Sequence, residues 1–174
     1  MFENKYLKYY KLSNEVIDPF FATEGSAAFD LKAFFDGTAV LGYTVDNQLM
    51  LTNIRNDGDT NFLEIKPCYR YKIPTGLIFD IPEGFKMNVN LRGGTAYKKG
   101  LILSNSTGII DWDYVQELFI VVTNTTNSIV IVENGERIAQ AYLEKVIPTE
   151  LVCMQTPPGQ KTSRNGGFNS TGVK

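Results

Sequence analysis

The sequence consists largely of short runs of β-branched and aromatic residues, separated by the turn formers Gly, Pro, Asn and Asp. Runs of strand length at this spacing favour an all-β sandwich, barrel or jelly roll and leave little room for helices. The pattern therefore predicts an all-β fold. The predicted strands are residues 6–11, 27–33, 39–45, 48–54, 69–79, 85–91, 101–103, 118–123, 129–132 and 137–146.

Turn signals define how these runs connect. Asp46 and Asn47 form a two-residue hairpin signal, and residues 56–61 (NDGDTN) are typical of the loop that follows. The hairpin and its loop resemble a local insertion at about 35–61. Such an insertion is either a decorative hairpin or a docking surface for another protein. The segment ENGER (133–137) predicts a further turn before the strand at 137–146.

The chain is long enough for one domain with a substantial core, at 174 residues. We expect a β core over residues 1–154 and a flexible C-terminal tail over 155–174, where the sequence is rich in Gly, Pro, Ser and Asn. The two cysteines, Cys68 and Cys153, are far apart and lack metal-ligand spacing, which indicates two buried or half-buried thiols in a reducing cytosol.

Charge and hydropathy exclude several functions. A net charge of -2 argues against binding to long nucleic acid but allows one small anionic ligand. No apolar run approaches the roughly 20 residues of a membrane span, and no signal peptide is visible, so we expect a cytoplasmic protein without a membrane.

The chain contains no histidine. This excludes a Ser-His-Asp triad, a Cys-His pair and any histidine-ligated metal. Base chemistry must therefore come from a carboxylate. The segment GIIDWDYVQEL (108–118) is the most suggestive place, because two carboxylates and a tyrosine follow a turn there.

Five segments along the chain carry a further signal: GSAAFDLKA (25–33), LRGGTAYKKGL (91–101), NSTGIIDWDYVQEL (105–118), GERIAQ (135–140) and RNGGFNSTG (164–172). Together they resemble the motifs of the trimeric dUTP pyrophosphatase (dUTPase) family, in the order in which that family has them. This resemblance implies a distorted jelly roll of the β-clip type. It also implies a homotrimer with shared active sites, each capped by a tail from a neighbouring copy.

The third motif implies the base and the selectors of substrate. Asn105, with the neighbouring hairpin backbone at Gly108 and Ile110, would read the polar edge of uracil. Asp111 would be the general base that activates water. Tyr114 would stack under the deoxyribose and exclude a 2′-hydroxyl. Without the resemblance, the same residues are an ordinary turn and strand end.

Asp113 is the alternative base, since it lies two residues after Asp111. On a strand, both carboxylates would project to the same face. The register of the motif favours Asp111 and leaves Asp113 as a structural hydrogen-bond acceptor.

The second motif departs from the family, which usually has Arg-Ser-Gly where this chain has Arg92, Gly93 and Gly94. The missing serine hydroxyl would contact the phosphate chain near the bond that breaks. The backbone N–H groups of the two glycines could approach a phosphate closely, and Arg92 would bind phosphate oxygens or hold the motif in place. Alternatively, the two glycines simply form a tight turn.

The first and fourth motifs imply contacts to the triphosphate and its metal. Asp30 would bind the water shell of a Mg²⁺ ion held mainly by the substrate phosphates. Gln140 would donate a hydrogen bond to an α-phosphate oxygen or its bound water. Taken alone, Asp30 is a solvated acid between core residues.

The fifth motif lies in the tail. Arg164 would engage the γ-phosphate, Gly167 would let the backbone wrap closely round the phosphates, and Phe168 would stack on uracil. Ser170 and Thr171 would add hydroxyl donors. Disorder is the other reading of such a composition, and both hold if the tail orders only on substrate.

The implied reaction is attack of Asp111-activated water on the α-phosphorus of dUTP, which releases dUMP and pyrophosphate. Two alternatives stay open. One is a dUTPase-like binding or regulatory protein with weak catalysis, suggested by Gly93 and by the insertion. The other is a dCTP deaminase, whose expected arginine-serine-serine motif and catalytic glutamate are not evident here.

Overall fold

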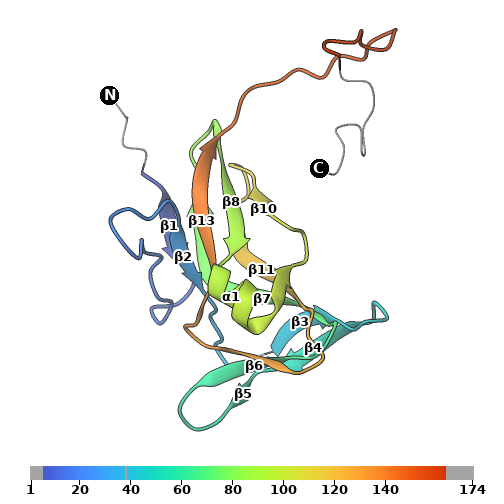
Figure 1. Cartoon of the computed structure of the whole chain (residues 1–174). Helices are drawn as coiled ribbons and strands as arrows, with labels where there is room; N and C mark the ends of the chain where they lie inside the picture. Colours follow the sequence, from blue (N-terminus) through green and yellow to red (C-terminus); the bar gives the residue numbers. More distant parts are fainter. Residues whose placement is uncertain (1–5, 38, 164–174) are drawn as a thin grey trace.

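The structure, a computed structural model, describes residues 6–37 and 39–163, and the regular secondary structure in this part of the chain consists almost entirely of β-strands (Figure 1). The predicted all-β class is therefore confirmed. One short helix, α1 (Gly93–Lys99), is present in this part of the chain. The strands are β1 (Lys8–Lys11), β2 (Phe29–Lys32), β3 (Ala39–Tyr43), β4 (Leu49–Asn53), β5 (Arg55–Asn56), β6 (Asn61–Ile65), β7 (Arg70–Asp80), β8 (Phe85–Leu91), β9 (Leu101–Leu103), β10 (Gly108–Ile110), β11 (Glu117–Asn124), β12 (Val130–Glu133) and β13 (Arg137–Lys145).

The strands form three antiparallel sheets. A six-stranded sheet has the order β4-β3-β7-β11-β9, and β1 also pairs with β7. A four-stranded sheet has the order β10-β8-β13-β2, and a three-stranded sheet has the order β12-β6-β5. Neighbouring strands in these sheets are mostly distant in sequence, so chain segments from both halves of the molecule meet in each sheet.

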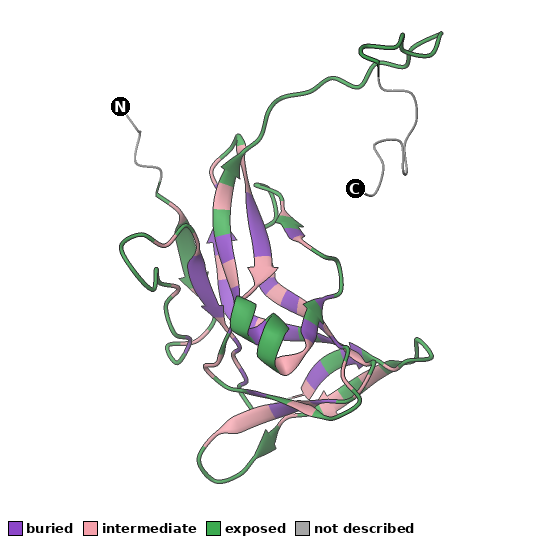
Figure 2. Ribbon diagram, viewed as in Figure 1, coloured by how far each residue is buried: buried purple, intermediate pink, exposed green. Residues whose placement is uncertain are grey.

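One hydrophobic core lies between the sheets. Strand β11 shows how the sequence produces it: its residues alternate between buried and half-buried positions, with Leu118, Ile120 and Val122 inside. Figure 2 shows this alternation along the strands. Burying each such side chain contributes about 1.5–3 kcal/mol. Phe29 of β2 and Phe79 of β7 join the four-stranded and six-stranded sheets, with ring centroids 5.8 Å apart.

The four-stranded sheet has one apolar face and one polar face. Met87 and Val89 of β8 are buried in the core together with Ala139 and Ala141 of β13. Successive side chains of a strand point to opposite faces, so the residues between them point away from the core. The polar side chains of this sheet are therefore presented on one surface.

Most predicted strands are present within one or two residues of their expected ends, and β8 and β9 have the predicted bounds. Strands β5, β6 and β10 were missed. Strands β5 (RN) and β10 (GII) have two and three residues, a length at which periodicity carries little information. Strand β6 has five residues, but its sequence NFLEI does not alternate strictly between apolar and polar positions.

The β3–β4 hairpin confirms the turn predicted at Asp46 and Asn47 but not its length. The Thr44 N–H donates to the Gln48 carbonyl at 3.0 Å, and the Asn47 N–H donates to the Thr44 carbonyl at 3.1 Å. The loop therefore has three residues, and the last, Asn47, has a φ of 58°. Asparagine tolerates this left-handed conformation, which a three-residue hairpin loop requires.

The proposed insertion at 35–61 is joined to the body of the protein. Strand β3 extends the six-stranded sheet through the pair Gly42 and Tyr71. Glycine is needed here, because a Cβ on Gly42 would lie 2.7 Å from the Arg70 carbonyl oxygen. The partner protein predicted for this segment stays a prediction.

After β13 the chain leaves the sheets, and residues 147–163 are exposed (Figure 2). This stretch is not wholly polar, since Ile147 and Leu151 are 80% and 94% exposed. Within a single copy, these apolar side chains find no place in the core.

Gly76 is a position where the fold depends on the absence of a side chain. Its φ is +68°, and a Cβ there would overlap Val16 and lie 2.9 Å from Cδ1 of Phe34. We expect Gly76→Ala to lower the free energy of unfolding by about 2–4 kcal/mol, through backbone strain and overpacking together. Gly84→Ala is the control, because Gly84 has a φ of +81° with nothing within 4 Å. Its expected cost is about 1–2 kcal/mol. Urea denaturation at one protein concentration measures both, and equal costs would contradict the packing argument.

Candidate active site

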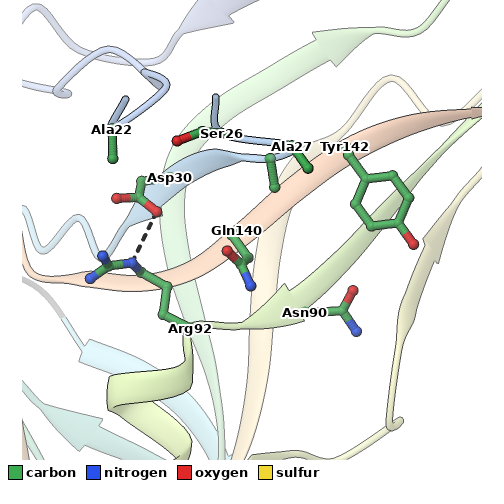
Figure 3. Close-up of a pocket in the computed structure, with 9 residues that line it drawn as sticks. Ala22, Ser26, Ala27, Asp30, Asn90, Arg92, Gln140 and Tyr142 are labelled. Atoms are coloured by element: carbon green, nitrogen blue, oxygen red, sulfur yellow. Dashed lines mark ion pairs between the residues drawn. The ribbon is translucent and has the colours of Figure 1, made fainter. Parts of the chain in front are cut away.

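A cavity of about 400 Å³ opens on the polar face of the four-stranded sheet (Figure 3). Side chains from β2, β8 and β13, and from the loop before β2, surround it. The lining residues are Ala22, Ser26, Ala27, Ala28, Asp30, Asn90, Arg92, Gln140 and Tyr142. The first, second and fourth motifs of the sequence analysis therefore meet at one place.

Strand register brings the polar side chains together. Gln140 of β13 lies opposite Asp30 of β2 on one side and opposite Asn90 of β8 on the other. Residues directly opposite one another in an antiparallel pair share a face of the sheet. Asp30, Gln140 and Asn90 thus form one row across three strands, and two of these residues were predicted for the site.

Asp30 holds two arginines. Its carboxylate is 6% exposed, and its Oδ1 lies 2.9 Å from Nε of Arg92 while its Oδ2 lies 3.2 Å from Nη1 of Arg137. The two cations compensate the desolvation of a buried carboxylate. Asp30 is therefore not a solvated acid between core residues, which was the alternative interpretation of the sequence.

A second, smaller hollow of about 300 Å³ lies beside the first, and Arg92 and Arg137 line it together with Lys98 and Lys99. Lys99 is paired with Glu136 at 2.6 Å. The residues around these two hollows thus carry more positive than negative charge, which suits an anionic ligand.

Gly93 and Gly94 do not form a tight turn, because they are the first two residues of α1. Helix propensity misses this, since glycine is unfavourable inside helices. The helix ends at Gly100, which is left-handed with a φ of 66°, and Lys98 and Lys99 occupy its last turn. Both Gly93 and Gly94 are exposed, and a Cβ on either would meet nothing within 4 Å. Their N–H groups belong to the first turn, where a helix has no internal acceptors.

The third motif begins in the turn between β9 and β10, which belong to different sheets: β9 pairs with β11, and β10 pairs with β8. Asn105 is exposed in this turn, and Ser106 is left-handed with a φ of 64°. Gly108 pairs with Val89 of β8, where a Cβ would lie 3.1 Å from Cβ of Val89. Glycine therefore lets β10 lie close to β8 as the edge strand of the four-stranded sheet.

Asp111 and Asp113 are not on a strand, so the argument that they share a strand face was wrong. Strand β10 ends at Ile110, and the Tyr114 N–H closes a turn on the Asp111 carbonyl at 3.2 Å. Asp113 was predicted to accept a structural hydrogen bond, but it makes none with the described residues. The Tyr114 hydroxyl donates to the Glu117 carbonyl at 2.9 Å, which fixes the ring beside the turn.

Within one copy, Asp111 lies far from Arg92. Ile110, which precedes Asp111, pairs with Met87 of β8, whereas Arg92 follows the C-terminal end of that strand. Five residues of extended chain separate Met87 from Arg92, which corresponds to roughly 16 Å. The structure thus brings Asp30, Arg92 and Gln140 together in the cavity, whereas Asn105, Asp111 and Tyr114 do not line it.

Arg164, Gly167, Phe168, Ser170 and Thr171 of the fifth motif lie outside the described residues. Their predicted contacts stay predictions.

No group of three Asp, Glu or Cys side chains in residues 6–37 and 39–163 could hold a metal ion. Asp30 is the one carboxylate among the residues that line the cavity, and both of its oxygens face guanidinium groups. These donors do not form a cage for a metal. They fit a metal only as an ion that a ligand carries and that Asp30 reaches through water.

Comparison with known proteins identifies the family. The sequence model of the dUTPase family matches residues 60–172. A deoxyuridine 5'-triphosphate nucleotidohydrolase of Hydrogenobaculum sp. is 33% identical over 165 residues, which cover 94% of this chain and 96% of that protein. The chain belongs to the dUTPase family. A relative with the same description from Aquifex aeolicus is 46% identical over 112 residues, 64% of this chain and 74% of that protein.

Solved dUTPase structures share the fold. The structure of a mutant dUTPase from Staphylococcus bacteriophage 80alpha, with dUpNHpp, aligns with a TM-score of 0.72 and 19% identity over 97% of this chain and 99% of that one. The Streptococcus mutans dUTPase aligns with a TM-score of 0.64 and 23% identity over 84% of this chain and 99% of that one. The predicted dUTPase-like β fold is thus confirmed.

Sequence reasoning missed several residues of the cavity, of which Asn90, Ser26 and Tyr142 carry polar groups. It also assigned no role in the site to Arg137, which the structure pairs with Asp30. A signal existed for Asn90, because it lies two residues before Arg92 on the polar face of a predicted strand. Arg137 could be assigned only once the register of β2 and β13 was known.

The ion pairs of Asp30 predict an effect on stability. Asp30→Asn removes the negative charge and leaves two guanidinium groups beside each other. We expect the free energy of unfolding to fall by about 1–3 kcal/mol, because the arginines are partly exposed and screened. Asp18→Asn is the matched control: Asp18 pairs with Lys11 at 3.3 Å but is 61% exposed, so its change should cost much less than that of Asp30. Denaturant melts compare the two, and equal losses would show that burial of Asp30 adds nothing.

Proposed function

We propose that this chain hydrolyses dUTP to dUMP and pyrophosphate, in active sites shared between the copies of a homotrimer. The observation that carries the proposal is the 33% identity to a deoxyuridine 5'-triphosphate nucleotidohydrolase over 94% of the chain. The cavity beside Arg92 and Gln140 supports it, because its donors suit a polyphosphate.

In this proposal the cavity binds the phosphates. Arg92 is half-buried, so it keeps access to a ligand while Asp30 orients its guanidinium. Gln140 donates an amide hydrogen bond to an α-phosphate oxygen. Gly93 and Gly94 offer backbone N–H groups at the start of α1. Such prepositioned donors stabilise charge that develops on the phosphates during the reaction.

The turn before β10, β10 itself and the turn after it, which together carry the third motif, provide the rest of the chemistry. Asn105 and the backbone around Gly108 and Ile110 read the uracil edge, and Tyr114 packs under the sugar. Asp111 acts as the general base that takes a proton from the attacking water. Its carboxylate is exposed and bonds to no described side chain, so it is available to a water molecule.

The predicted cofactor is Mg²⁺, carried by the triphosphate. The ion would neutralise phosphate charge when it is bound. Asp30 would contact it through water while its carboxylate keeps Arg92 and Arg137 in place. The phosphate oxygens, and not this chain, would supply most of the ligands.

Sharing of the site follows from the distance between its parts. Asp111 must reach the α-phosphorus, but within one copy it lies roughly 16 Å along the sheet from the end of β8 that carries Arg92. If a second copy presents its own Asp111 to this cavity, the base and the phosphate-binding residues come together. A closed three-fold assembly repeats this contact and gives each copy one complete site.

The exposed C-terminal segment supports the same assembly. Residues 147–163 leave the core and carry apolar side chains such as Leu151 into solvent. In a trimer, this segment would deliver the fifth motif, Arg164 to Thr171, to a neighbouring copy.

Loss of the motif serine is the observation that favours a second function, dUTP binding with little turnover. Gly93 replaces the serine, and nothing in the structure fills the space where its side chain would stand. The phosphate would then lack one donor.

Release of pyrophosphate from dUTP tests the proposal. We expect turnover of dUTP in the presence of Mg²⁺, and at least about 100-fold less with dCTP, dTTP and UTP. Asp111→Asn should lower kcat by at least about 1,000-fold, since the base is lost, while a non-hydrolysable dUTP analogue still binds. Asp113→Asn is the matched control and should stay within a few-fold of the parent.

Other outcomes of this assay select the alternatives. Tight binding of dUTP with negligible turnover would identify a regulatory protein, and release of ammonia from dCTP would identify a deaminase. Parent-like turnover by Asp111→Asn would show that the base has been assigned to the wrong residue.

Mixed assemblies test whether the site is shared. Arg92→Ala and Asp111→Asn copies are each inactive, but after unfolding and refolding together at equal amounts about a quarter of the sites take both intact residues from different copies. We expect about a quarter of the parent activity from this mixture. Arg92→Ala mixed with Gln140→Ala is the control, because both residues line one cavity of one copy, so no activity should return. Equal results from the two mixtures would contradict a shared site.

A further inference from the structure

We propose that Asn90 is a further substrate-contacting residue, whose amide donates a hydrogen bond to the phosphate chain of the bound nucleotide beside Gln140. This inference rests on the proposed function and adds a donor that the family motifs do not include. It concerns a side chain of β8 on the polar face of the four-stranded sheet (Figure 3).

The register of β8 directs Asn90 into the site. Asn90 lies directly opposite Gln140, which itself lies opposite Asp30, so the three side chains share one face. Asn90 is half-buried and lines the same cavity as Arg92, which follows two residues later. The carboxamide therefore stands among the groups proposed to bind phosphate.

The amide of Asn90 has unused hydrogen-bonding capacity. Its one bond to a described residue joins Nδ2 to Oγ1 of Thr107 at 3.3 Å. A carboxamide carries two N–H donors and one acceptor oxygen, so at least one N–H stays available to a ligand. Asn88, two residues earlier on the same face, differs because it is buried and does not line the cavity.

A phosphate oxygen of the bound nucleotide would accept a hydrogen bond from this N–H. Phosphate oxygens need several donors, and Gly93 supplies no hydroxyl where the family usually has serine. Arg92 is partly neutralised by Asp30. A neutral amide adds a donor that needs no counter-ion, and it is fixed in place by a rigid strand.

Two substitutions of similar size separate a phosphate contact from a structural role. Asn90→Leu removes the donor and should lower kcat/KM for dUTP by about 10- to 100-fold. Asn90→Asp removes the amide donor but offers an oxygen to which the Thr107 hydroxyl can donate in return, and it places a negative charge beside the phosphates, so it should lower kcat/KM at least as much as Asn90→Leu. Thr107→Val breaks the bond to Asn90 but leaves the amide, and should stay within about three-fold of the parent. Melting temperature and oligomeric state confirm that each variant is folded.

The reverse order would overturn the inference. If Asn90 only holds the turn at Thr107, Asn90→Asp keeps parent-like activity, and Thr107→Val loses as much as Asn90→Leu. Parent-like activity of Asn90→Leu would equally overturn it. These outcomes are read against a parent that hydrolyses dUTP, whereas a parent that neither hydrolyses dUTP nor binds its non-hydrolysable analogue refutes the proposed function itself.

Discussion

The buried carboxylate of Asp30, held between Arg92 and Arg137, is the contact on which the phosphate side of the site depends. It joins three strands of one sheet, because Asp30 lies on β2, Arg92 follows β8 and Arg137 begins β13. Each partner needs the others: without the arginines the carboxylate would be buried unpaired, and without Asp30 the two cations would repel each other. An arginine anchored in this way loses less side-chain entropy when a phosphate binds.

The separation of Asp111 from Arg92 within one copy has a topological cause. Strand β10 pairs with residues 87–89 of β8 and runs antiparallel to it, so the turn that carries Asp111 follows β10 at the end that points away from Arg92. In the proposed function, a single copy would have a phosphate-binding cavity with no general base beside it, and a general base with no cavity beside it. Association of identical copies lets the rigid sheet keep its register and still brings the two halves together.

The sequence predicted the β class, most strands and three residues that meet in the cavity, because local patterns and the family motifs carry that information. It missed α1, since Gly93 and Gly94 disfavour helix and the helix is fixed by its capping Gly100 and by packing. It also placed Asp111 and Asp113 on a strand, where the structure has a turn closed by Tyr114. The ligands of Asp30 depend on cross-strand register, and single-sequence periodicity contains no register between strands distant in the chain.

The charge of the molecule and the charge of the site have opposite signs, and this bears on which ligand the site selects. The whole chain carries a net charge of -2, while Arg92, Arg137, Lys98 and Lys99 gather around α1 against Asp30 and Glu136. A local excess of cations on an acidic protein attracts a compact anion but gives a long polyanion no continuous surface to follow. Neutral side chains such as Gln140 and Asn90 line the cavity and can add directional bonds without adding charge. In the proposed function, attraction and geometric selection are thus carried by different side chains.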